Sequence, residues 1–355
     1  MSLVSNIRPT SRIPLKYVGR HSPRVNTINH NTKHHPALFS KTPYSKKSVV
    51  CKVALITGGV RGIGYNIAEG LLDVGTKAVI FGDAKTEDCK EAVCKLNEKY
   101  GEPRAFFQTC DISKKSDLEK LFKTVKEKFN KIDFVVNNAD IDEEWDKTMY
   151  VNLNGLVRGT LLGFKYMGAQ SGGKGGYIIN VSSILGLQPF FASPIYSGTK
   201  HFGIGFSRSM GDKYFYDRSK VKVMTLCPSI TNTTKNRKDG LPEFKDLASD
   251  GARSIRRLTS QDPSEIGKGL LTMLEDAENG SVWVSEGKDF YKARIPDRRT
   301  LRLSTRPGGT AGDCGKENPC KVKVPKKKKD KCEKEVKKAP CDRDNPCRRQ
   351  NNTCK

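Results

Sequence analysis

Between residues 51 and 293, short apolar runs alternate with longer stretches in which apolar residues recur three or four positions apart. The short runs predict buried strands, and the longer stretches predict amphipathic helices. The expected strands are 52–57, 78–81, 105–109, 133–136, 177–181, 221–226 and, as the last one, 282–284. The expected helices are 63–73, 86–100, 115–129, 143–167, one that carries residues 196 and 200, and one near 263–275.

This alternation predicts the class of the fold. Strands separated by helices of this length form a parallel sheet that is covered by helices on both faces. We therefore expect an α/β protein with a Rossmann-type, doubly wound parallel sheet in a single domain. Ligands of such folds bind at the carboxyl ends of the strands, and glycine-rich or polar segments follow the expected strands at 58–64, 82–83, 110–112 and 137–140.

Charge divides the chain into three parts, and the formal net charge is +25. Residues 1–48 contain nine Lys or Arg and no Asp or Glu. Residues 49–293 contain 35 Lys or Arg and 31 Asp or Glu, and residues 294–355 contain 20 Lys or Arg and eight Asp or Glu. We expect a basic disordered arm at 1–48, the folded domain at 49–293 and a basic tail at 294–355 that is rich in Cys, Lys and Pro. No apolar run is long enough to predict a transmembrane helix.

The N-terminal arm bears on localisation. Its arginines and its lack of acids resemble a mitochondrial presequence, but Pro9, Pro14 and Pro23 would break the amphipathic helix that such a signal needs. The five cysteines of the central domain show no paired spacing, which is typical of a reducing compartment. We expect a cytoplasmic protein, with mitochondrial import as the alternative.

The C-terminal tail repeats the pattern C-x-x-x-N-P-C at 314–320 and 341–347. This is not the C-x-x-C spacing of zinc sites, so no metal site is expected. The lysine run 326–329 is typical of a nuclear signal or a polyanion-binding segment. In composition, the tail resembles the Cys/Lys/Pro-rich extensions of insect sperm-tail proteins. A polyanion or a structural assembly is therefore a candidate partner, and a sperm-tail structure is a further candidate location.

The strongest chemical signal lies at residues 183–200. Tyr196 and Lys200 are four residues apart and share one face of a helix, where a cation beside the phenol stabilises the phenolate. Such a phenolate can take the proton of an alcohol while a hydride leaves the same carbon. Ser183 ends an apolar run and can meet Tyr196 from the end of a strand. Alone, a Tyr-x-x-x-Lys pair is more often an ordinary helix surface.

A glycine-rich turn follows the first expected strand, with the spacing G-x-x-x-G-x-G at Gly58, Gly62 and Gly64. A turn of this kind between a strand and a helix lets the backbone approach a pyrophosphate. Asp83 follows the second expected strand, about where an acid binds the adenosine ribose. Because an acid there repels a 2′-phosphate, we expect NAD rather than NADP.

Taken together, residues 51–293 resemble the short-chain dehydrogenase/reductases. The resemblance rests on Thr57-Gly58-x-x-x-Gly62-x-Gly64, Asp111, Asn137-Asn138-Ala139, Asn152, Ser183, Tyr196 and Lys200. Within this family, the segments 148–167, 176–183 and 270–280 are similar to the 15-hydroxyprostaglandin dehydrogenase and insect alcohol dehydrogenase-like group. The resemblance implies an NAD-dependent oxidoreductase of a secondary alcohol or ketone that forms homodimers through the helices carrying Asn152 and Tyr196.

The resemblance also implies roles for individual residues. Tyr196 would be the acid–base group, Lys200 would assist it and hold the nicotinamide ribose, and Ser183 would bind the substrate oxygen. Asn152 would support a water that relays protons from Lys200. The remaining contacts to the cofactor would come from Gly58, Arg61, Gly62, Ile63, Gly64, Asp83, Asp111, Ile112, Asn137, Ile230 and Thr233.

Two positions depart from the family pattern. Asp140 stands where the family has the glycine of Asn-Asn-Ala-Gly, and Ser229 stands where it has the glycine of a Pro-Gly pair. The aspartate adds bulk and negative charge near the expected dinucleotide. Two functions therefore remain open: an active dehydrogenase, or a catalytically weak dehydrogenase-like domain that is reused in a structural or polyanion-binding protein.

The substrate is indicated by two segments. Leu185, Leu187, Phe190 and Phe191 form either an apolar wall of the substrate pocket or part of the core. Residues 234–257, where this family keeps its substrate lid, hold seven Lys or Arg against four acids. A basic lid over an apolar pocket would suit a hydroxy fatty acid, a prostaglandin-like substrate or another carboxylated alcohol, although a solvated lid explains the charges equally well.

Overall fold

The computed structural model describes residues 49–233, 247–276 and 278–301. The chain divides into a compact unit that ends at Ile295 and a second unit that begins at Pro296. Of the second unit, the described part contains one short 3₁₀ helix, Arg298–Leu301. The expected arm at 1–48 and nearly all of the expected tail lie outside the described residues, as does part of the expected lid.

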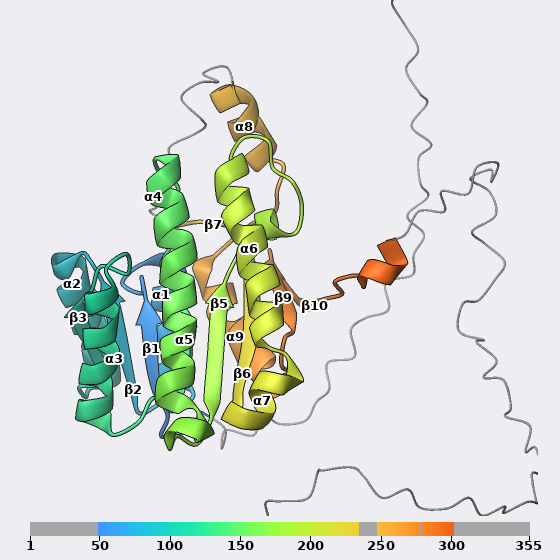
Figure 1. Ribbon diagram of the computed structural model, residues 1–355. Helices are drawn as coiled ribbons and strands as arrows, with labels where there is room; N and C mark the ends of the chain where they lie inside the picture. The colour runs from blue at the N-terminus through green and yellow to red at the C-terminus, as the bar shows by residue number, and fades with distance from the viewer. Residues whose placement is uncertain (1–48, 234–246, 277, 302–355) are drawn as a thin grey trace, which may run out of the picture. The chain divides into compact units, whose positions relative to one another are not determined.

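An eight-stranded sheet forms the centre of the compact unit (Figure 1). Its strand order is β10-β9-β6-β5-β4-β1-β2-β3. All neighbours are parallel except β10, which pairs antiparallel with β9. The strands are β1 Val53–Thr57, β2 Ala78–Asp83, β3 Ala105–Thr109, β4 Phe134–Asn137, β5 Gly176–Val181, β6 Val221–Pro228, β9 Val282–Glu286 and β10 Asp289–Ala293.

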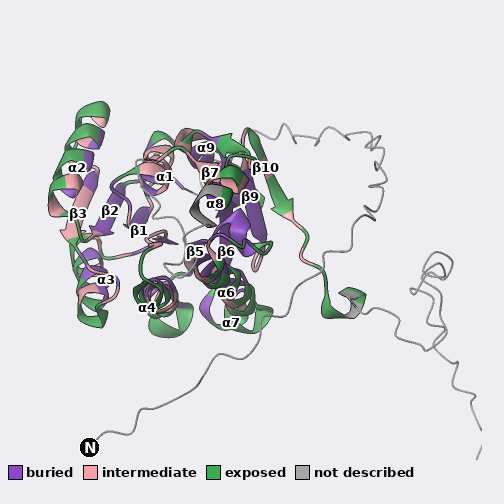
Figure 2. Cartoon of the chain, turned by 90° about the horizontal axis from the view of Figure 1, so that it is seen from above, coloured by how far each residue is buried: buried purple, intermediate pink, exposed green. Residues whose placement is uncertain are grey.

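Helices cover both faces of this sheet (Figure 2). Apolar side chains of α1, α2 and α9 pack on one face, and those of α3 and α5 pack on the other. The helices are α1 Gly62–Asp73, α2 Thr86–Tyr100, α3 Lys115–Phe129, α4 Trp145–Met149, α5 Leu156–Met167, α6 Pro194–Met210, α7 Lys213–Ser219, α8 Leu247–Ile255 and α9 Pro263–Asp276. The Rossmann-type, doubly wound α/β fold expected from the sequence is thereby confirmed.

Several local features differ from the expected elements, including the helices α7 and α8, which the sequence did not predict. The stretch 143–167 is not one continuous α-helix, because a π-helical segment, Tyr150–Gly155, separates α4 from α5. The strand β9 is not the last one, since β10 follows after a turn at Gly287 and adds an antiparallel edge. Two short strands, β7 Ile230–Thr231 and β8 Ser260–Gln261, form a separate parallel pair where the sequence predicted no strand.

The register of the strands brings their carboxyl ends to one edge. Thr57 of β1 lies opposite Gly82 of β2 and Asn137 of β4, and Asn137 lies opposite Asn180 of β5. The segments that follow these strands therefore emerge side by side. They include the glycine-rich turn, the Asn-Asn-Ala-Asp segment and Ser183, which come from distant parts of the sequence.

Candidate active site

A cavity of about 520 Å³ lies at this edge of the sheet. Its walls come from the turn after β1, the segment after β4, the end of β5, the helix α6, the segment after β6 and the region of α8. The lining residues are Ile63, Asn138, Asp140, Asp142, Val181, Ser182, Ser183, Tyr196, Pro228, Ser229, Ile230, Thr231, Thr233, Ala252, Ile255 and Arg256.

Helix α6 places Tyr196 and Lys200 beside each other. The helix starts with Pro194 in its first turn, where the missing N–H costs no hydrogen bond. Both side chains are buried, and the Lys200 ammonium lies 5.1 Å from the centre of the Tyr196 ring. Ser182 fixes this part of the helix, because its hydroxyl donates to the Lys200 carbonyl at 2.8 Å.

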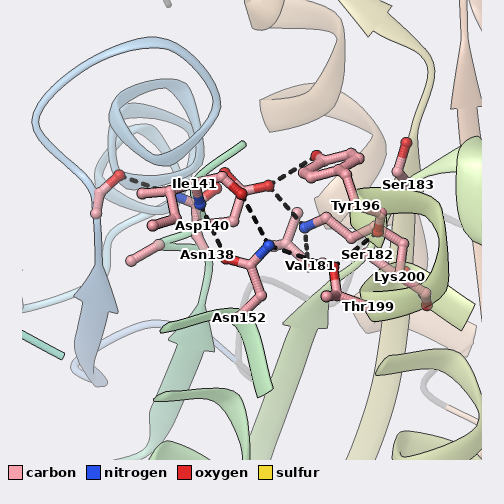
Figure 3. Close-up of polar contacts among 12 residues, drawn as sticks. Asn138, Asp140, Ile141, Asn152, Val181, Ser182, Ser183, Tyr196, Thr199 and Lys200 are labelled. Carbon is pink, nitrogen blue, oxygen red and sulfur yellow. Dashed lines mark hydrogen bonds and ion pairs between the residues drawn. The ribbon is translucent and has the colours of Figure 1, made fainter. Parts of the chain in front are cut away.

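Asp140 lies between the phenol and the ammonium (Figure 3). Its Oδ2 accepts a hydrogen bond from the Tyr196 hydroxyl at 2.8 Å and lies 2.7 Å from the Lys200 Nζ. The Asp140 side chain is only 19% exposed, and that of Lys200 is 6% exposed. The two charges therefore form an ion pair that is largely shielded from water. Sequence reasoning placed Asp140 near the cofactor but did not predict its contact with these two residues.

Asn152 holds the segment that carries Asp140. Its side-chain oxygen accepts from the Ile141 N–H, and its amide group donates to the Ile141 carbonyl, both at 2.9 Å. The same amide also donates to the Thr199 hydroxyl at 3.2 Å. Asn152 belongs to the π-helical segment, a local widening that often occurs at functional sites. The structure thus brings Asn152 beside Tyr196 and Lys200, as a clamp on the neighbouring backbone.

Ser183 follows β5 and faces the same cavity. Its extended backbone begins a short 3₁₀ helix, Ile184–Gly186, and its hydroxyl oxygen accepts from the Leu185 N–H at 3.2 Å. The hydroxyl also contacts the Pro228 carbonyl at 3.5 Å. Ser183 and Tyr196 therefore line one cavity, as the sequence predicted, and Ser183 has a local backbone contact that orients it.

The turn after β1 fits the close approach of a ligand. Gly58 and Gly62 adopt φ values of +63° and +57°, a region that side chains other than glycine rarely enter. A Cβ at Gly58 would lie 2.6 Å from the Ala139 Cα, and one at Gly64 would lie 2.6 Å from the Gly59 Cα. These glycines allow the turn to pack closely against Ala139 and against itself at the amino end of α1. The backbone N–H groups of such a helix end are suited to hold a pyrophosphate.

The remaining cofactor candidates lie along the same edge of the sheet. Asp83 ends β2, and burial raises the pKa of its carboxyl above the usual 3.8, although the Lys85 N–H donates to it at 3.1 Å. Arg61 pairs with Asp88 at 3.0 Å. Asp111 accepts from the N–H and hydroxyl of Ser113. Asp83, Arg61, Asp111 and the neighbouring, buried Ile112 do not line the cavity described above.

Asn137 does not line the cavity described above. It is buried, and its amide donates to the Asn180 side chain at 2.8 Å and to the Thr160 hydroxyl at 3.3 Å. Asn180 in turn donates to the Ser207 hydroxyl at 2.8 Å. This buried network joins β4 and β5 to α5 and α6 under the site, and Asn138 lines the cavity instead. Asn180 could have been found as a polar residue within an apolar strand.

Residues after β6 complete the cavity. Ile230 and Thr233 line it, as does Ser229, whose hydroxyl donates to the Thr259 carbonyl at 2.6 Å. The four apolar residues considered for a pocket wall do not line it. Leu185 and Phe190 are buried in a core cluster, whereas Leu187 and Phe191 are exposed. Ala252, Ile255 and Arg256 form the part of the wall that comes from the α8 region.

Within the described ranges, no group of three or more His, Cys, Asp or Glu could hold a metal ion. The cysteines Cys51, Cys89, Cys94, Cys110 and Cys227 are free thiols. Burial raises the pKa of Cys89, Cys110 and Cys227 to about 12, so these three are not reactive thiolates near neutral pH. None of the helices in the described part is long and apolar enough to cross a membrane.

The family model described as short chain dehydrogenase matches residues 52–242, which is more than half of the chain. The chain belongs to this family. The 15-hydroxyprostaglandin dehydrogenase of Macaca fascicularis, named as an NAD(+) enzyme, is 37% identical over 65% of this chain and 89% of its own length. Alcohol dehydrogenase 1 of Ceratitis cosyra is 30% identical over 70% of this chain and 96% of its own length.

A solved short chain dehydrogenase from Burkholderia cenocepacia, in complex with NADP, has the same fold with a TM-score of 0.57. It is 23% identical and covers 68% of this chain and 98% of its own. The resemblance inferred from the motifs is thus confirmed. As a member of the short-chain dehydrogenase family, the chain is an oxidoreductase that acts on CH–OH groups.

Proposed function

We propose that this protein oxidises a secondary alcohol, or reduces the corresponding ketone, with NAD as the cofactor. The observation that carries the proposal is that Tyr196 and Ser183 line one cavity, with the Lys200 ammonium 5.1 Å from the centre of the Tyr196 ring. Full-length protein mixed with NAD and a series of secondary alcohols should form reduced nicotinamide. If protein that binds NAD forms none with any alcohol of the series at any pH, the proposal fails.

In the proposed mechanism, Tyr196 exchanges a proton with the substrate oxygen and Ser183 donates a hydrogen bond to that oxygen. The positive charge of Lys200 favours the ionised tyrosine. Gly58, Gly62, Ile63 and Gly64 would hold the pyrophosphate, and Ile230 and Thr233 would line the nicotinamide end. Bound NAD would supply the acceptor for the hydride, which is chemistry that the protein itself does not have.

The proposed preference for NAD over NADP rests on Asp83, because an acid beside the adenosine ribose disfavours a 2′-phosphate. We expect Asp83→Asn to reduce the ratio of NAD to NADP affinity by about tenfold or more, which corresponds to 1.4 kcal/mol. Calorimetric titration with both cofactors measures this ratio, and Asp111→Asn is the control. An unchanged ratio in Asp83→Asn would place the discrimination elsewhere.

Asp83 also makes stability depend on pH. Because burial raises its pKa in the fold, the protonated form is favoured there, and this stabilisation is lost as pH rises through the raised pKa. At neutral pH the ionised carboxylate therefore costs stability. We expect cofactor-free Asp83→Asn to melt at a higher temperature than the natural protein at neutral pH, with the difference shrinking as pH falls toward 3.8. A lower melting temperature at neutral pH would contradict this assignment.

For the substrate, we propose a secondary alcohol that carries a carboxylate, such as a hydroxy fatty acid or a prostaglandin-like acid. Arg256 supports this, because it lines the cavity together with the apolar Ala252 and Ile255. We expect Arg256→Ala to raise KM for an acidic substrate by about tenfold, as for the loss of an ion pair, while KM for an uncharged alcohol stays constant. The control is Arg253→Ala, since Arg253 pairs with Asp250 at 3.4 Å and does not line the cavity. Equal effects on both substrates in Arg256→Ala would exclude charge recognition.

We also propose a homodimer in the cytoplasm. The helices α4, α5, α6 and α7 expose large apolar side chains, a composition typical of an interface. These are Trp145, Met149, Leu161, Phe202, Tyr214 and Phe215. A mass of one chain in analytical ultracentrifugation at micromolar concentration would contradict the dimer. The alternative of a structural or polyanion-binding role depends mainly on tail residues outside the described part.

A further inference from the structure

The position of Asp140 is fixed by the backbone that carries it. On one side, Asn138 donates to the carbonyls of Thr57 and Gly58 at 3.2 and 2.6 Å, and the Ala139 N–H donates to the Thr57 hydroxyl at 3.3 Å. On the other side, Asn152 holds both polar groups of the Ile141 backbone. The carboxylate therefore projects from a segment that is held at both ends.

One oxygen of this carboxylate contacts both groups on which the proposed acid–base chemistry depends. Oδ2 accepts the proton of the Tyr196 hydroxyl at 2.8 Å and lies 2.7 Å from the Lys200 ammonium. A hydrogen bond to an anionic acceptor favours the neutral phenol, because the phenolate has no proton to donate. The carboxylate also offsets the lysine charge that would otherwise favour the phenolate. Both effects act in the same direction, in a pocket where screening by water is weak.

Other titratable groups lie in the same region of the molecule as Tyr196. Asp142 and Arg256 line the same cavity, and Cys227 of β6 belongs to the same core cluster as Tyr196. His201 lies on the same helix, where its ring is hydrogen-bonded to the Ser197 carbonyl, and Glu143 pairs with Lys147 of α4. Asp142 accepts from the Ser193 hydroxyl at 3.0 Å. It therefore offers a second carboxylate in the same cavity for comparison.

We infer that Asp140 is a positioning residue that keeps the proton on Tyr196, so that near neutral pH the site stands ready to donate a proton to a carbonyl oxygen. The alcohol-oxidising form, with an ionised Tyr196, then becomes available at higher pH than in a site with an uncharged residue at position 140. The kinetic part of this inference rests on the proposed function. The part that concerns the proton of the Tyr196 phenol is independent of the proposed function.

The direct test is the ionisation of Tyr196 in the cofactor-free, full-length protein. The chain has 11 tyrosines, so the tyrosinate absorbance of each protein is compared with that of its Tyr196→Phe counterpart over a range of pH. In Asp140→Asn, we expect Tyr196 to ionise about one to three pH units lower than in the natural protein. Asp142→Asn should give a smaller shift. An ionisation that stays unchanged in Asp140→Asn, or moves to higher pH, would overturn the inference.

The kinetic test uses the pH at which alcohol oxidation reaches half of its maximal rate. This pH should fall in Asp140→Asn and in Asp140→Gly, which serves as a second variant if the asparagine disturbs the fold. A shift to higher pH with a lower maximal rate would mean that the carboxylate accepts the tyrosine proton during turnover, and would overturn the inference. If no alcohol is oxidised, the proposed function fails, but the absorbance titration still decides where the phenol proton lies.

Discussion

Tyr196→Phe is expected to lower kcat/KM for alcohol oxidation by about 10²–10⁴-fold, the usual contribution of a positioned acid–base group. The substitution removes one oxygen from a buried side chain and keeps the ring that lies beside Lys200 in the cavity wall. Binding of NAD should change by less than about tenfold, or 1.4 kcal/mol. Steady-state rates with calorimetric NAD binding measure the two effects separately.

The chain offers a matched control for this substitution. Tyr216 and Lys220 repeat the Tyr-x-x-x-Lys spacing, and their ring and ammonium lie 5.4 Å apart. This second pair does not line the cavity, so Tyr216→Phe should leave kcat/KM unchanged. If Tyr196→Phe lost no more activity than Tyr216→Phe, the proposed acid–base role would be wrong.

Gly58→Ala is expected to destabilise the fold by about 2–5 kcal/mol and to weaken NAD binding strongly. The left-handed backbone costs a residue with a side chain about 1–2 kcal/mol, and Gly58 has a φ of +63°. A Cβ there would also lie 2.6 Å from the Ala139 Cα, and overpacking of this kind costs about 1–3 kcal/mol. The displaced backbone is the segment that leads to Asp140. Urea unfolding and calorimetric titration with NAD measure the two losses.

Gly101→Ala separates the two causes. Gly101 ends α2 with a φ of +67°, but a Cβ there would meet nothing within 4 Å. This control should lose only the backbone contribution of about 1–2 kcal/mol and should bind NAD normally. If both variants were equally destabilised and both bound NAD, the close approach of the Gly58→Ala side chain to Ala139 would not contribute to the loss of stability.

Most of the sheet and its helices followed from the periodicity of the sequence. The strand 105–109 and the helices 86–100 and 115–129 have the predicted bounds, because the apolar residues of each repeat with the period of one element. The two helices end just before Gly101 and Asn130, which both adopt the left-handed conformation. The π-helical segment could not be predicted from the sequence, because its apolar residues continue the periodicity of α4 and α5. β10 is half-exposed and charged, so it lacks the apolar run that marked the buried strands.

At the site, the sequence indicated which residues would lie close together but not how their side chains would be oriented. The end of β5 brought Ser183 to the cavity as expected, and the segment after β4 brought Asn138 there in place of the predicted Asn137. Asn137, the neighbour of Asn138, instead faces Asn180 and Thr160, because consecutive side chains of an extended segment point to opposite sides. The contact of Asp140 with Tyr196 joins segments 56 residues apart, and such pairing depends on the assembled sheet.

Transfer of deuterium from the carbinol carbon of a labelled secondary hydroxy acid to NAD, followed by mass spectrometry, tests the central claim most directly. Full-length protein should yield singly deuterated reduced nicotinamide and the corresponding keto acid, and Tyr196→Phe should yield little of either in the same time. If protein that binds NAD yielded a keto acid without label in the cofactor, or no product from any labelled alcohol, the site would not perform the proposed hydride transfer.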